Sequence, residues 1–534
     1  LLNQTIVGYN KTDGPASHVY PEKNWKDLGT PLTLDSYNQF YMTFQSISNI
    51  NTGDTNNFIR DETQFTNTTR WNKGRHNMSF GGEYHYARGD VVNNYRAQAR
   101  FYFTRTAGYT GYDVADFLVG KFGEFIQGVG EFKNTRFHLF NMFFNDSMKL
   151  NRRLTLDLGV RWEPFLPNTD TLGKLAVLGG AGAQSTRFVN APPGILYPGD
   201  AGVPGGGYKS TWGNFGPRVG LAYDVTGDGK TSIRAGYGVF YDRLNTLQTN
   251  SAATQAPFGT VVDFYGAAND SMANPYANCP GGNPFKTIGF DAIGTDTLNP
   301  GKDVSFVLPM TAFLYARDLR NPYVSSWNLT VERQLGHGWL ARTSYAGSKG
   351  TALASGRDIN APLANATATT STTNQRRPLY PNFAQMSLME PAGNSSYHSG
   401  QFTAEKSFTH GFTVLGNYTW AKTIDNNVGS ANKANGTNVT NPLDQSFDRG
   451  PADYNLKHVF NFSGVWAIPG KVQSRAANLF ISGWNMTSII AWRSGFPFTI
   501  LSGQDNARTG QGNQRGDLTG TSPYLSNSDH GAIA

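Results

Sequence analysis

The stretch from Trp212 to Arg243 alternates apolar residues with small or charged residues over two runs of about ten residues each. Between the two runs, residues 226–230 read TGDGK, a composition typical of a tight turn. Because successive side chains of a strand point to opposite faces, the pattern predicts a long β-hairpin with one apolar face. About ten residues is also the length at which a tilted strand crosses a bilayer. The predicted apolar face consists of Phe215, Pro217, Val219, Leu221, Tyr223 and Val225 on the first strand and Ile233, Ala235, Tyr237, Val239 and Tyr241 on the second.

Similar alternating stretches recur along the chain, and the connections between them alternate in length. Residues 154–162, LTLDLGVRW, place Leu, Val and Trp on one face and Thr, Asp, Gly and Arg on the other. Residues 412–420, FTVLGNYTW, repeat the pattern. Long insertions at about 165–210 and 245–321 are rich in Gly, Pro and polar residues. The short connections are residues 151–153, 226–230, 336–338 and 410–411.

These features predict an all-β chain of roughly fourteen strands, folded as a large antiparallel up-and-down transmembrane β-barrel. Such barrels have short periplasmic turns at one rim and long extracellular loops at the other, which matches the alternation of connections. A closed sheet also pairs every backbone group inside the bilayer. We expect residues 1–36 to form an irregular lead-in segment and residues 37–534 to form the barrel, truncated at its C-terminus. A soluble extracellular all-β protein is the alternative, because a half-buried sandwich strand also alternates.

Composition supports a barrel and argues against several other classes of protein. Hydrophobic residues make up only 38% of the 534 residues, whereas aromatic residues reach 13% and glycines number 61. This balance suits a sheet with aromatic girdles and tight turns better than a helical core. The net charge is +7, but lysines and arginines are scattered, so we expect no nucleic-acid partner. The single cysteine, Cys279, excludes a disulfide framework within the chain.

Seven stretches, in order along nearly the whole chain, resemble the β-barrel of TonB-dependent outer-membrane receptors, specifically the Oar-like group. The resemblance implies a 22-stranded barrel in the outer membrane of a Gram-negative bacterium, with an N-terminal plug that contacts the TonB complex. Members of the group import scarce ligands with energy relayed by TonB. We expect this chain to be a barrel fragment that lacks the plug and the terminal strands. The stretches are RHNMSFGGEYHYAR, RRLTLDLGVRWEP, NFGPRVGLAYDVTGDGKTSIRAGYGVFYDR, NPYVSSWNLTVERQLGHGWLARTSYAGSKGTAL, GNYTWAKTIDN, FDRGPADYNLKHVFNFSGVWAIP and GWNMTSIIAWRSGFPFTI.

The expected function is therefore import of a siderophore, cobalamin, glycan or peptide across the outer membrane, with outer-membrane lipid around the barrel. A passive porin or an adhesin-type barrel is the alternative. We predict no enzymatic activity, no cofactor and no metal site. Glu83 and His85 share a strand face, but two ligands do not make a metal site. The side chains predicted to face the lumen are Asp157, Arg161, Arg218, Asp224 and Arg234.

Overall fold

The computed structural model describes residues 1–16, 23, 25–30, 32, 40–53, 56–93, 97, 99–103, 109–243, 255–259, 261–265, 271–277, 282–283, 300–363, 365, 368, 372–409, 411–426, 439–470, 474–502, 506–507, 509, 514–516 and 520. Cys279 lies outside these residues. None of the helices in the described part of the chain is both long and apolar enough to span a membrane.

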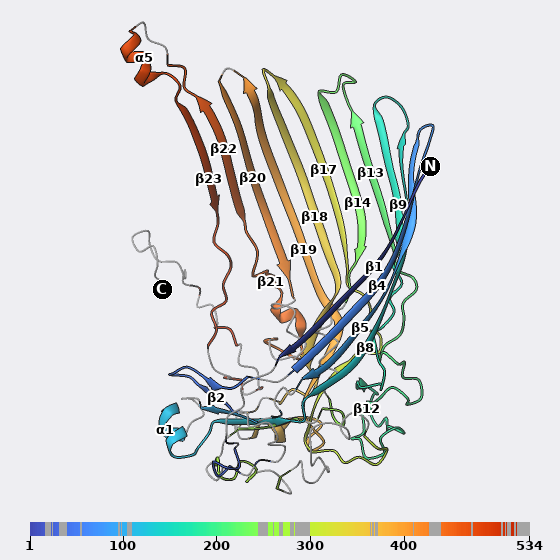
Figure 1. The fold of residues 1–534 in the computed structure, drawn as a ribbon, viewed down its shortest axis with the longest axis vertical. Helices are drawn as coiled ribbons and strands as arrows, with labels where there is room; N and C mark the ends of the chain where they lie inside the picture. The colour runs from blue at the N-terminus through green and yellow to red at the C-terminus, as the bar shows by residue number, and fades with distance from the viewer. Residues whose placement is uncertain are drawn as a thin grey trace.

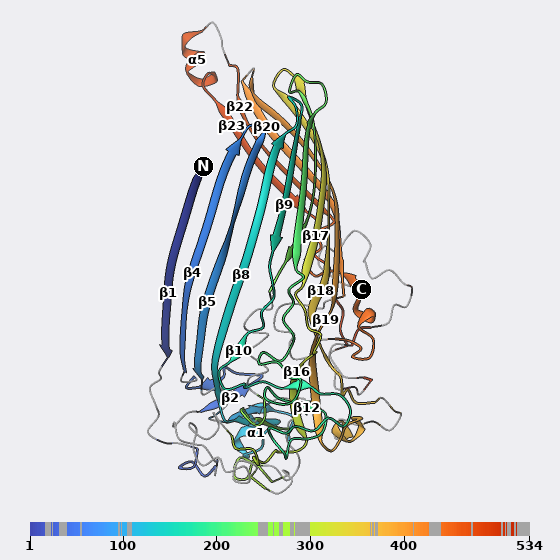
Figure 2. The ribbon, with the colours of Figure 1, turned by 90° about the vertical axis from the view of Figure 1, so that its right-hand side faces the viewer.

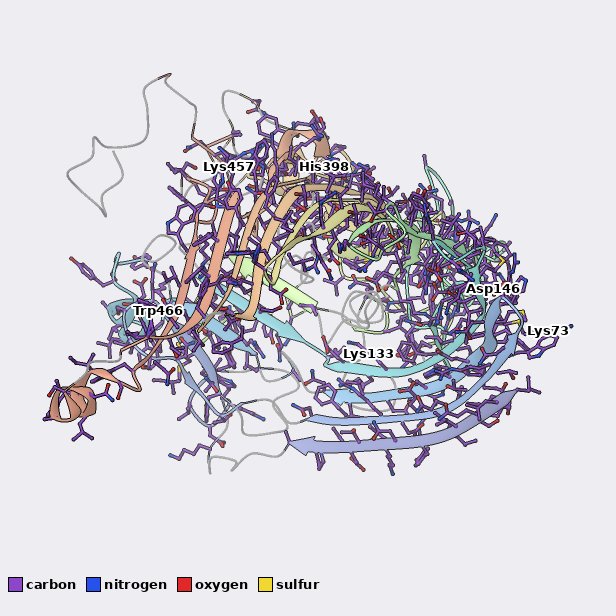
Figure 3. The ribbon with its side chains drawn as sticks, turned by 90° about the horizontal axis from the view of Figure 1, so that it is seen from above. Lys73, Lys133, Asp146, His398, Lys457 and Trp466 are labelled. Carbon is purple, nitrogen blue, oxygen red and sulfur yellow. The ribbon has the colours of Figure 1, made fainter. Side chains whose placement is uncertain are left out.

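The long strands form one antiparallel sheet in which each strand pairs with the next long strand along the chain (Figure 1). The sheet is strongly curved (Figures 2 and 3), and we call it the wall. Register pairs join β1 only to β4 and β23 only to β22, so these two strands are the edges of the described wall. In order, the wall strands are β1 (Leu2–Ala16), β4 (Asn56–Lys73), β5 (His76–Asn93), β8 (Glu131–Lys149), β9 (Leu154–Trp162), β13 (Phe215–Asp224), β14 (Thr231–Tyr241), β17 (Tyr323–Gly336), β18 (Trp339–Asp358), β19 (Phe383–Thr409), β20 (Phe412–Asp425), β22 (His458–Ala467) and β23 (Asn485–Arg493).

The hairpin predicted between Trp212 and Arg243 is confirmed as β13 and β14. Val219 stands opposite Tyr237, which fixes the register of the pair. The two side chains are 46% and 45% exposed, so the apolar face points away from the protein. The opposite face approaches its neighbours closely: a Cβ at Gly216 would lie 2.6 Å from the Val239 carbonyl oxygen. We call the apolar face the outward face and the other the inner face.

Outward aromatic side chains gather near both ends of the wall strands. On β20, Phe412 and Trp420 share the outward face eight positions apart, which is about 26 Å along a strand. That separation is comparable with the apolar band of a membrane barrel, about 25 Å tall between two aromatic girdles. The alternation therefore builds a surface of the height that a lipid bilayer covers.

One expectation about the N-terminal segment is wrong. Residues 1–36 were expected to be irregular, but Leu2–Ala16 form β1, which pairs with β4 along its whole length. Its side chains are exposed on both faces, so no burial imposes an alternating pattern on this edge strand. The sequence also contains Gly14 and Pro15, which are weak strand formers, and Pro is tolerated at a sheet edge.

The connections at the two ends of the wall differ as predicted, with one exception. The short turns lie together at the upper end in Figure 1, which we call the short-turn rim, and the opposite end is the loop rim. Gly336, His337 and Gly338 all have positive φ, as a tight hairpin requires. The exception at the short-turn rim is the helix α5 (Arg475–Ile481), which lies between β22 and β23.

Part of the segment 37–534, expected to form the barrel, builds a second sheet at the loop rim instead. Residues 100–103 and 124–128 form β6 and β7 and contribute nothing to the wall. The second sheet consists of β2 (Tyr41–Phe44), β3 (Ile50–Asn51), β6 (Arg100–Phe103), β7 (Glu124–Gly128) and β15 (Val261–Tyr265), and α1 (Asp113–Leu118) lies beside it. The remaining short elements are β10 (Thr169–Asp170), β11 (Val177–Leu178), β12 (Ile195–Leu196), β16 (Met310–Tyr315), η3 (Asn374–Arg376), η5 (Gln445–Asp448) and β21 (Gly450–Pro451).

Candidate functional site at the loop rim and inner face

The long connections at the loop rim fold into a packed layer, which we call the loop layer. Phe101, Phe103 and Phe125 have no exposed surface. Trp25 packs edge-on against Phe101 with ring centroids 5.0 Å apart. These residues come from connections that leave the wall at different strands, so the layer ties separate loops into one body.

Asp113 fastens α1 to the connection that follows β2. Its carboxylate accepts hydrogen bonds from the backbone N–H groups of Gln45 and Ser46, at 2.8 and 2.6 Å, and from the Ser46 hydroxyl. The Ser46 hydroxyl, together with the backbone donors, lowers the pKa of Asp113 from 3.8 to about 2. Asp116 accepts hydrogen bonds from Tyr109 N and Thr110 N in the same way. Both carboxylates therefore hold the helix by accepting backbone hydrogen bonds.

A second part of the loop layer is built from the connection between β9 and β13. The Arg187 guanidinium donates to three carbonyl oxygens, those of Leu172, Gly173 and Pro198, at 2.7 to 2.9 Å. Asp200 accepts from Thr186 N at 2.7 Å and Arg187 N at 2.8 Å. A loop that satisfies its backbone groups through buried side chains is ordered without regular secondary structure.

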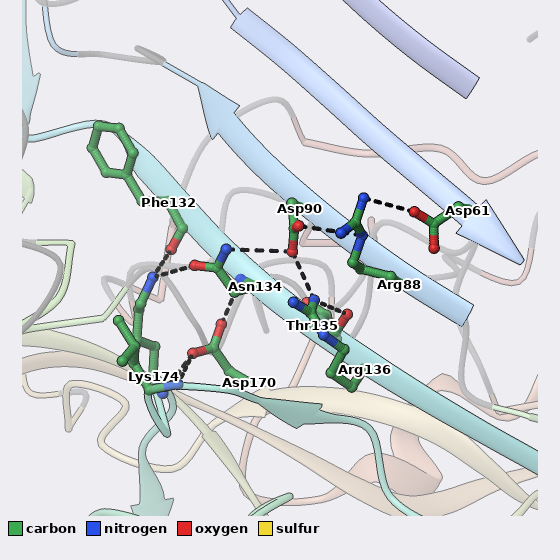
Figure 4. Close-up of polar contacts among 10 residues, drawn as sticks. Asp61, Arg88, Asp90, Phe132, Asn134, Thr135, Arg136, Asp170 and Lys174 are labelled. Atoms are coloured by element: carbon green, nitrogen blue, oxygen red, sulfur yellow. Dashed lines mark hydrogen bonds and ion pairs between the residues drawn. The ribbon is translucent and has the colours of Figure 1, made fainter. Parts of the chain in front are cut away.

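A polar network joins this connection to the ends of the wall strands (Figure 4). Asp170 accepts from Asn134 N at 2.8 Å, and Lys174 Nζ donates to the Phe132 carbonyl oxygen at 2.8 Å. Burial lowers the pKa of Lys174 from its ordinary value, although the nearby Asp170 opposes that shift. On the neighbouring strands Asp90 accepts from Arg136 at 2.7 Å. The loop layer is thus anchored to the wall by charged groups.

A ladder of ionisable side chains from β4, β5 and the end of β9 lies on the inner face. His85 Nδ1 lies 2.6 Å from Glu62, and its Nε2 lies 3.7 Å from Glu83. Glu83 in turn lies 3.5 Å from the Arg161 guanidinium, whose Nε donates to Glu163 at 2.8 Å. The contacts run along one strand, between adjacent strands or, for Glu83 and Arg161, across the intervening β8. A charged group of a ligand could bind to this ladder only by replacing one of the existing side-chain partners.

Two of the predicted lumen arginines lie on the inner face in separate surroundings. The Arg218 guanidinium sits 4.9 Å from the centre of the Phe240 ring, a cation–π contact. Arg234 lies 4.0 Å from Glu332, which is held by both Nε and Nη2 of Arg342 at 2.7 and 2.6 Å. These arginines do not converge with Arg161 on one binding group.

The two predicted aspartates differ in role. Asp157 is directly opposite Gly220 on the inner face, where a Cβ on the glycine would lie 3.2 Å from the Asp157 Cβ. Asp224 accepts from Gly227 N at 2.9 Å and Gly229 N at 3.0 Å, so it orders the short turn. No group of three or more metal-ligating side chains occurs in the described residues.

Sequence reasoning missed Glu62, Glu332 and Arg342. Each is one polar residue among several on a strand, and its partner stands on a neighbouring strand. The register between strands identifies such pairs, and it is set by the turns and by burial over the whole hairpin. In the β17–β18 hairpin, Glu332 and Arg342 are directly opposite one another, so the tight turn at 336–338 was an available signal.

A family model described as an outer membrane beta barrel domain matches residues 1–533. The chain belongs to this family. As an outer membrane beta barrel domain it resides in the outer membrane of a Gram-negative bacterium and is not an enzyme. The prediction of a transmembrane β-barrel is thereby confirmed.

Solved structures with a similar fold share little sequence with this outer membrane beta barrel domain. The outer membrane transporter YddB from Escherichia coli is 13% identical with a TM-score of 0.45, over 95% of this chain and 50% of that chain. The alcaligin outer membrane receptor FauA from Bordetella pertussis is 11% identical with a TM-score of 0.34, over 83% and 47%. The ferripyoverdine receptor from Pseudomonas aeruginosa is 10% identical with a TM-score of 0.39, over 85% and 40%. The chain therefore spans half or less of these proteins. No curated protein matches it.

Proposed function

We propose that this outer membrane beta barrel domain is the barrel portion of a TonB-dependent transporter, which binds a scarce ligand and imports it with energy relayed by TonB. The observation that carries the proposal is the loop layer, in which Phe101, Phe103 and Phe125 pack without exposed surface at one end of the wall. A packed layer at the extracellular rim suits capture of a particular ligand, because a preorganised surface loses less conformational freedom on binding.

The inner face supports the same proposal. Its ladder from Glu62 through His85, Glu83 and Arg161 to Glu163 presents both signs of charge along one side of the wall. A polar surface of this kind binds hydrophilic ligands and suits contact with a polar plug. Siderophores, cobalamin, glycans and peptides all fit this chemistry, and the TonB complex would act through a plug.

A passive porin or an adhesin is the rival function, and energy dependence distinguishes it from the proposed transporter. The test deletes the complete gene and supplies iron as ferric siderophores, or cobalamin, oligosaccharides or peptides, as the only source of the corresponding nutrient. Loss of growth on one source is expected, with restoration by the complete gene.

The same growth assay in a strain without TonB decides between the two classes. A transporter loses growth on that nutrient to the same extent as the gene deletion, and raising the nutrient concentration restores it. Growth that needs this gene but is unaffected by loss of TonB would contradict active transport and favour a porin. Unaltered growth on every source, together with loss of surface attachment, would favour an adhesin.

A further inference from the structure

Tyrosine–histidine hydrogen bonds repeat on the outward face of the wall with one geometry. In each pair the histidine stands on the neighbouring strand, two positions closer to the loop rim than the residue directly opposite the tyrosine. The same arrangement thus occurs on three separate strand pairs, and we call the three pairs the tyrosine–histidine belt. The pairs are Tyr84–His138 at 2.9 Å, Tyr345–His398 at 2.8 Å and Tyr418–His458 at 2.8 Å, measured from the hydroxyl oxygen to Nδ1.

The middle pair is flanked by two lysines. Lys422 stands directly opposite His398 on β20. Lys349 stands on β18, the strand on the other side of His398, opposite Ser396 and Ser325. All three charged or ring side chains share the outward face, and both lysines are exposed. Among the described residues neither lysine has an ion-pair or hydrogen-bond partner, and the positions directly opposite them carry no negative charge.

Cations near the first pair of the belt are neutralised. Arg136 lies two positions beyond His138 toward the loop rim, and its guanidinium binds Asp90 at 2.7 Å. Arg88 on β5 binds Asp61 at 2.7 Å. Near its first pair the belt therefore has compensated charge on β4, β5 and β8, whereas near the middle pair the described residues leave positive charge on β18 and β20 without an acidic partner. A general need for surface polarity would not produce this difference between the two sides of the wall.

The hydrogen bonds around His398 leave it with an outward donor. The Trp327 indole N–H can only donate, so the Tyr345 oxygen accepts there, at 3.4 Å. The Tyr345 hydroxyl is then directed at His398 Nδ1, and a neutral imidazole with an accepting Nδ1 carries its proton on Nε2. His398 thus offers an Nε2–H donor on the face that carries the ammonium groups of Lys349 and Lys422. The rings of Trp327 and Tyr345 lie against His398. Donors of these types together bind phosphate.

We propose that Lys349, His398 and Lys422 bind the phosphate of a glycolipid headgroup in the outer leaflet of the outer membrane. The site faces lipid, because its residues share the outward face with Trp327 and Trp420. Lys422 lies two positions beyond the exposed Trp420 toward the loop rim, and outward aromatic side chains mark the height at which headgroups meet the hydrocarbon in membrane barrels. A soluble phosphate compound would approach the inner face or the loop layer, whereas this surface is reached from the bilayer. The inference is independent of whether the barrel transports a ligand.

The test measures lipid binding by the complete protein in nanodiscs of zwitterionic lipid, with lipopolysaccharide titrated in and bound lipid counted by native mass spectrometry. The double variant K349Q/K422Q removes both charges and is expected to bind roughly 25-fold more weakly, since each lysine near a membrane surface contributes about fivefold. His398→Phe keeps a ring but removes the Nε2 donor, and should weaken binding severalfold. K230Q at the short-turn rim is the matched control and should bind as the wild type does.

Two further arms identify the ligand chemistry. Lipopolysaccharide treated with phosphatase should bind the wild type as weakly as intact lipopolysaccharide binds K349Q/K422Q. Inorganic phosphate should compete poorly, because it lacks the acyl chains that would contact the outward aromatic side chains of the wall. Equal binding by the wild type and K349Q/K422Q, with folding verified by heat-modifiable migration, would overturn the proposal. So would equal affinity for the dephosphorylated lipid, or complete displacement by millimolar inorganic phosphate, which would indicate a soluble anion as ligand.

Discussion

Aromatic residues are exposed on the outward face of the wall and buried inside the loop layer. On the wall, Phe215 is 54% exposed on the outward face, whereas Gly216, next to it, is buried on the inner face. In the loop layer, Phe101 and Phe103 have no exposed surface. The difference follows from the solvent on each side: lipid covers the outward face of the wall, and water surrounds the loop layer. Apolar side chains of the wall therefore face outward and those of the loop layer face inward, so the same substitution should have different consequences in the two regions.

The largest difference should follow from phenylalanine truncation. Phe101→Ala leaves a cavity in the loop layer and should destabilise that layer by about 3–5 kcal/mol. Phe215→Ala, the matched substitution on the wall, exposes no cavity because lipid fills the space, so its effect should be much smaller. Limited proteolysis of the long connections measures the first effect, and heat-modifiable migration of the wall measures the second. Equal protease resistance of Phe101→Ala and wild type would contradict the buried core.

Arginine substitutions on the two faces of β13 should show which face contacts lipid and which faces the lumen. Leu221→Arg places a charge on the outward face and should cost roughly 2–4 kcal/mol near the bilayer midplane. Ala222→Arg places the charge on the inner face, where water solvates it. The repulsion between the new arginine and Arg234 directly opposite should lower the free energy of unfolding by less than about 1 kcal/mol. Urea unfolding of the protein in lipid vesicles gives both values. A harmless Leu221→Arg together with a costly Ala222→Arg would show that the two faces are reversed.

Asp224 gives a smaller effect that distinguishes a turn residue from a lumen residue. Asp224→Ala removes the acceptor for Gly227 N and Gly229 N in an exposed turn and should cost about 1 kcal/mol. Asp224→Asn keeps one accepting oxygen and should recover part of that loss. Urea unfolding in vesicles measures both variants. A change in ligand uptake without any change in stability would instead assign Asp224 to the lumen.

The smallest effect should be a pH dependence confined to the loop layer. The pKa of Asp113 is lowered to about 2 in the folded protein from 3.8, so its contribution is complete above pH 3.8 and is lost as the pH falls through about 2. Hydrogen exchange of residues 45–46 and of α1 should therefore accelerate across this window while exchange in the wall does not. Asp113→Asn should exchange faster at neutral pH and lose the acid dependence. Acid-sensitive exchange that persists unchanged in Asp113→Asn would assign the effect to another group.

The sequence was sufficient to predict the wall and insufficient to predict the loop layer. Leu154–Trp162 alternates because one face meets lipid and the other meets water, so the pattern is local. Phe101 and Phe103 also alternate, but nothing in that pattern tells which sheet the strand joins. That choice depends on contacts with residues far along the chain, such as Val262. For the same reason the partners of Arg161 could not be identified although its inward direction could be predicted.

The pairing order of the wall also determines when the loop layer can form. Each wall strand pairs with the long strand before it, so the wall can grow strand by strand along the chain, by short turns at one rim and long connections at the other. The core around Phe101 needs Phe44, from before β4, and Val262, from after β14. It cannot close until the strands between these residues have been placed. Ordering of the loop rim therefore comes late in assembly, and exposure of its aromatic residues would mark barrels that are still incomplete.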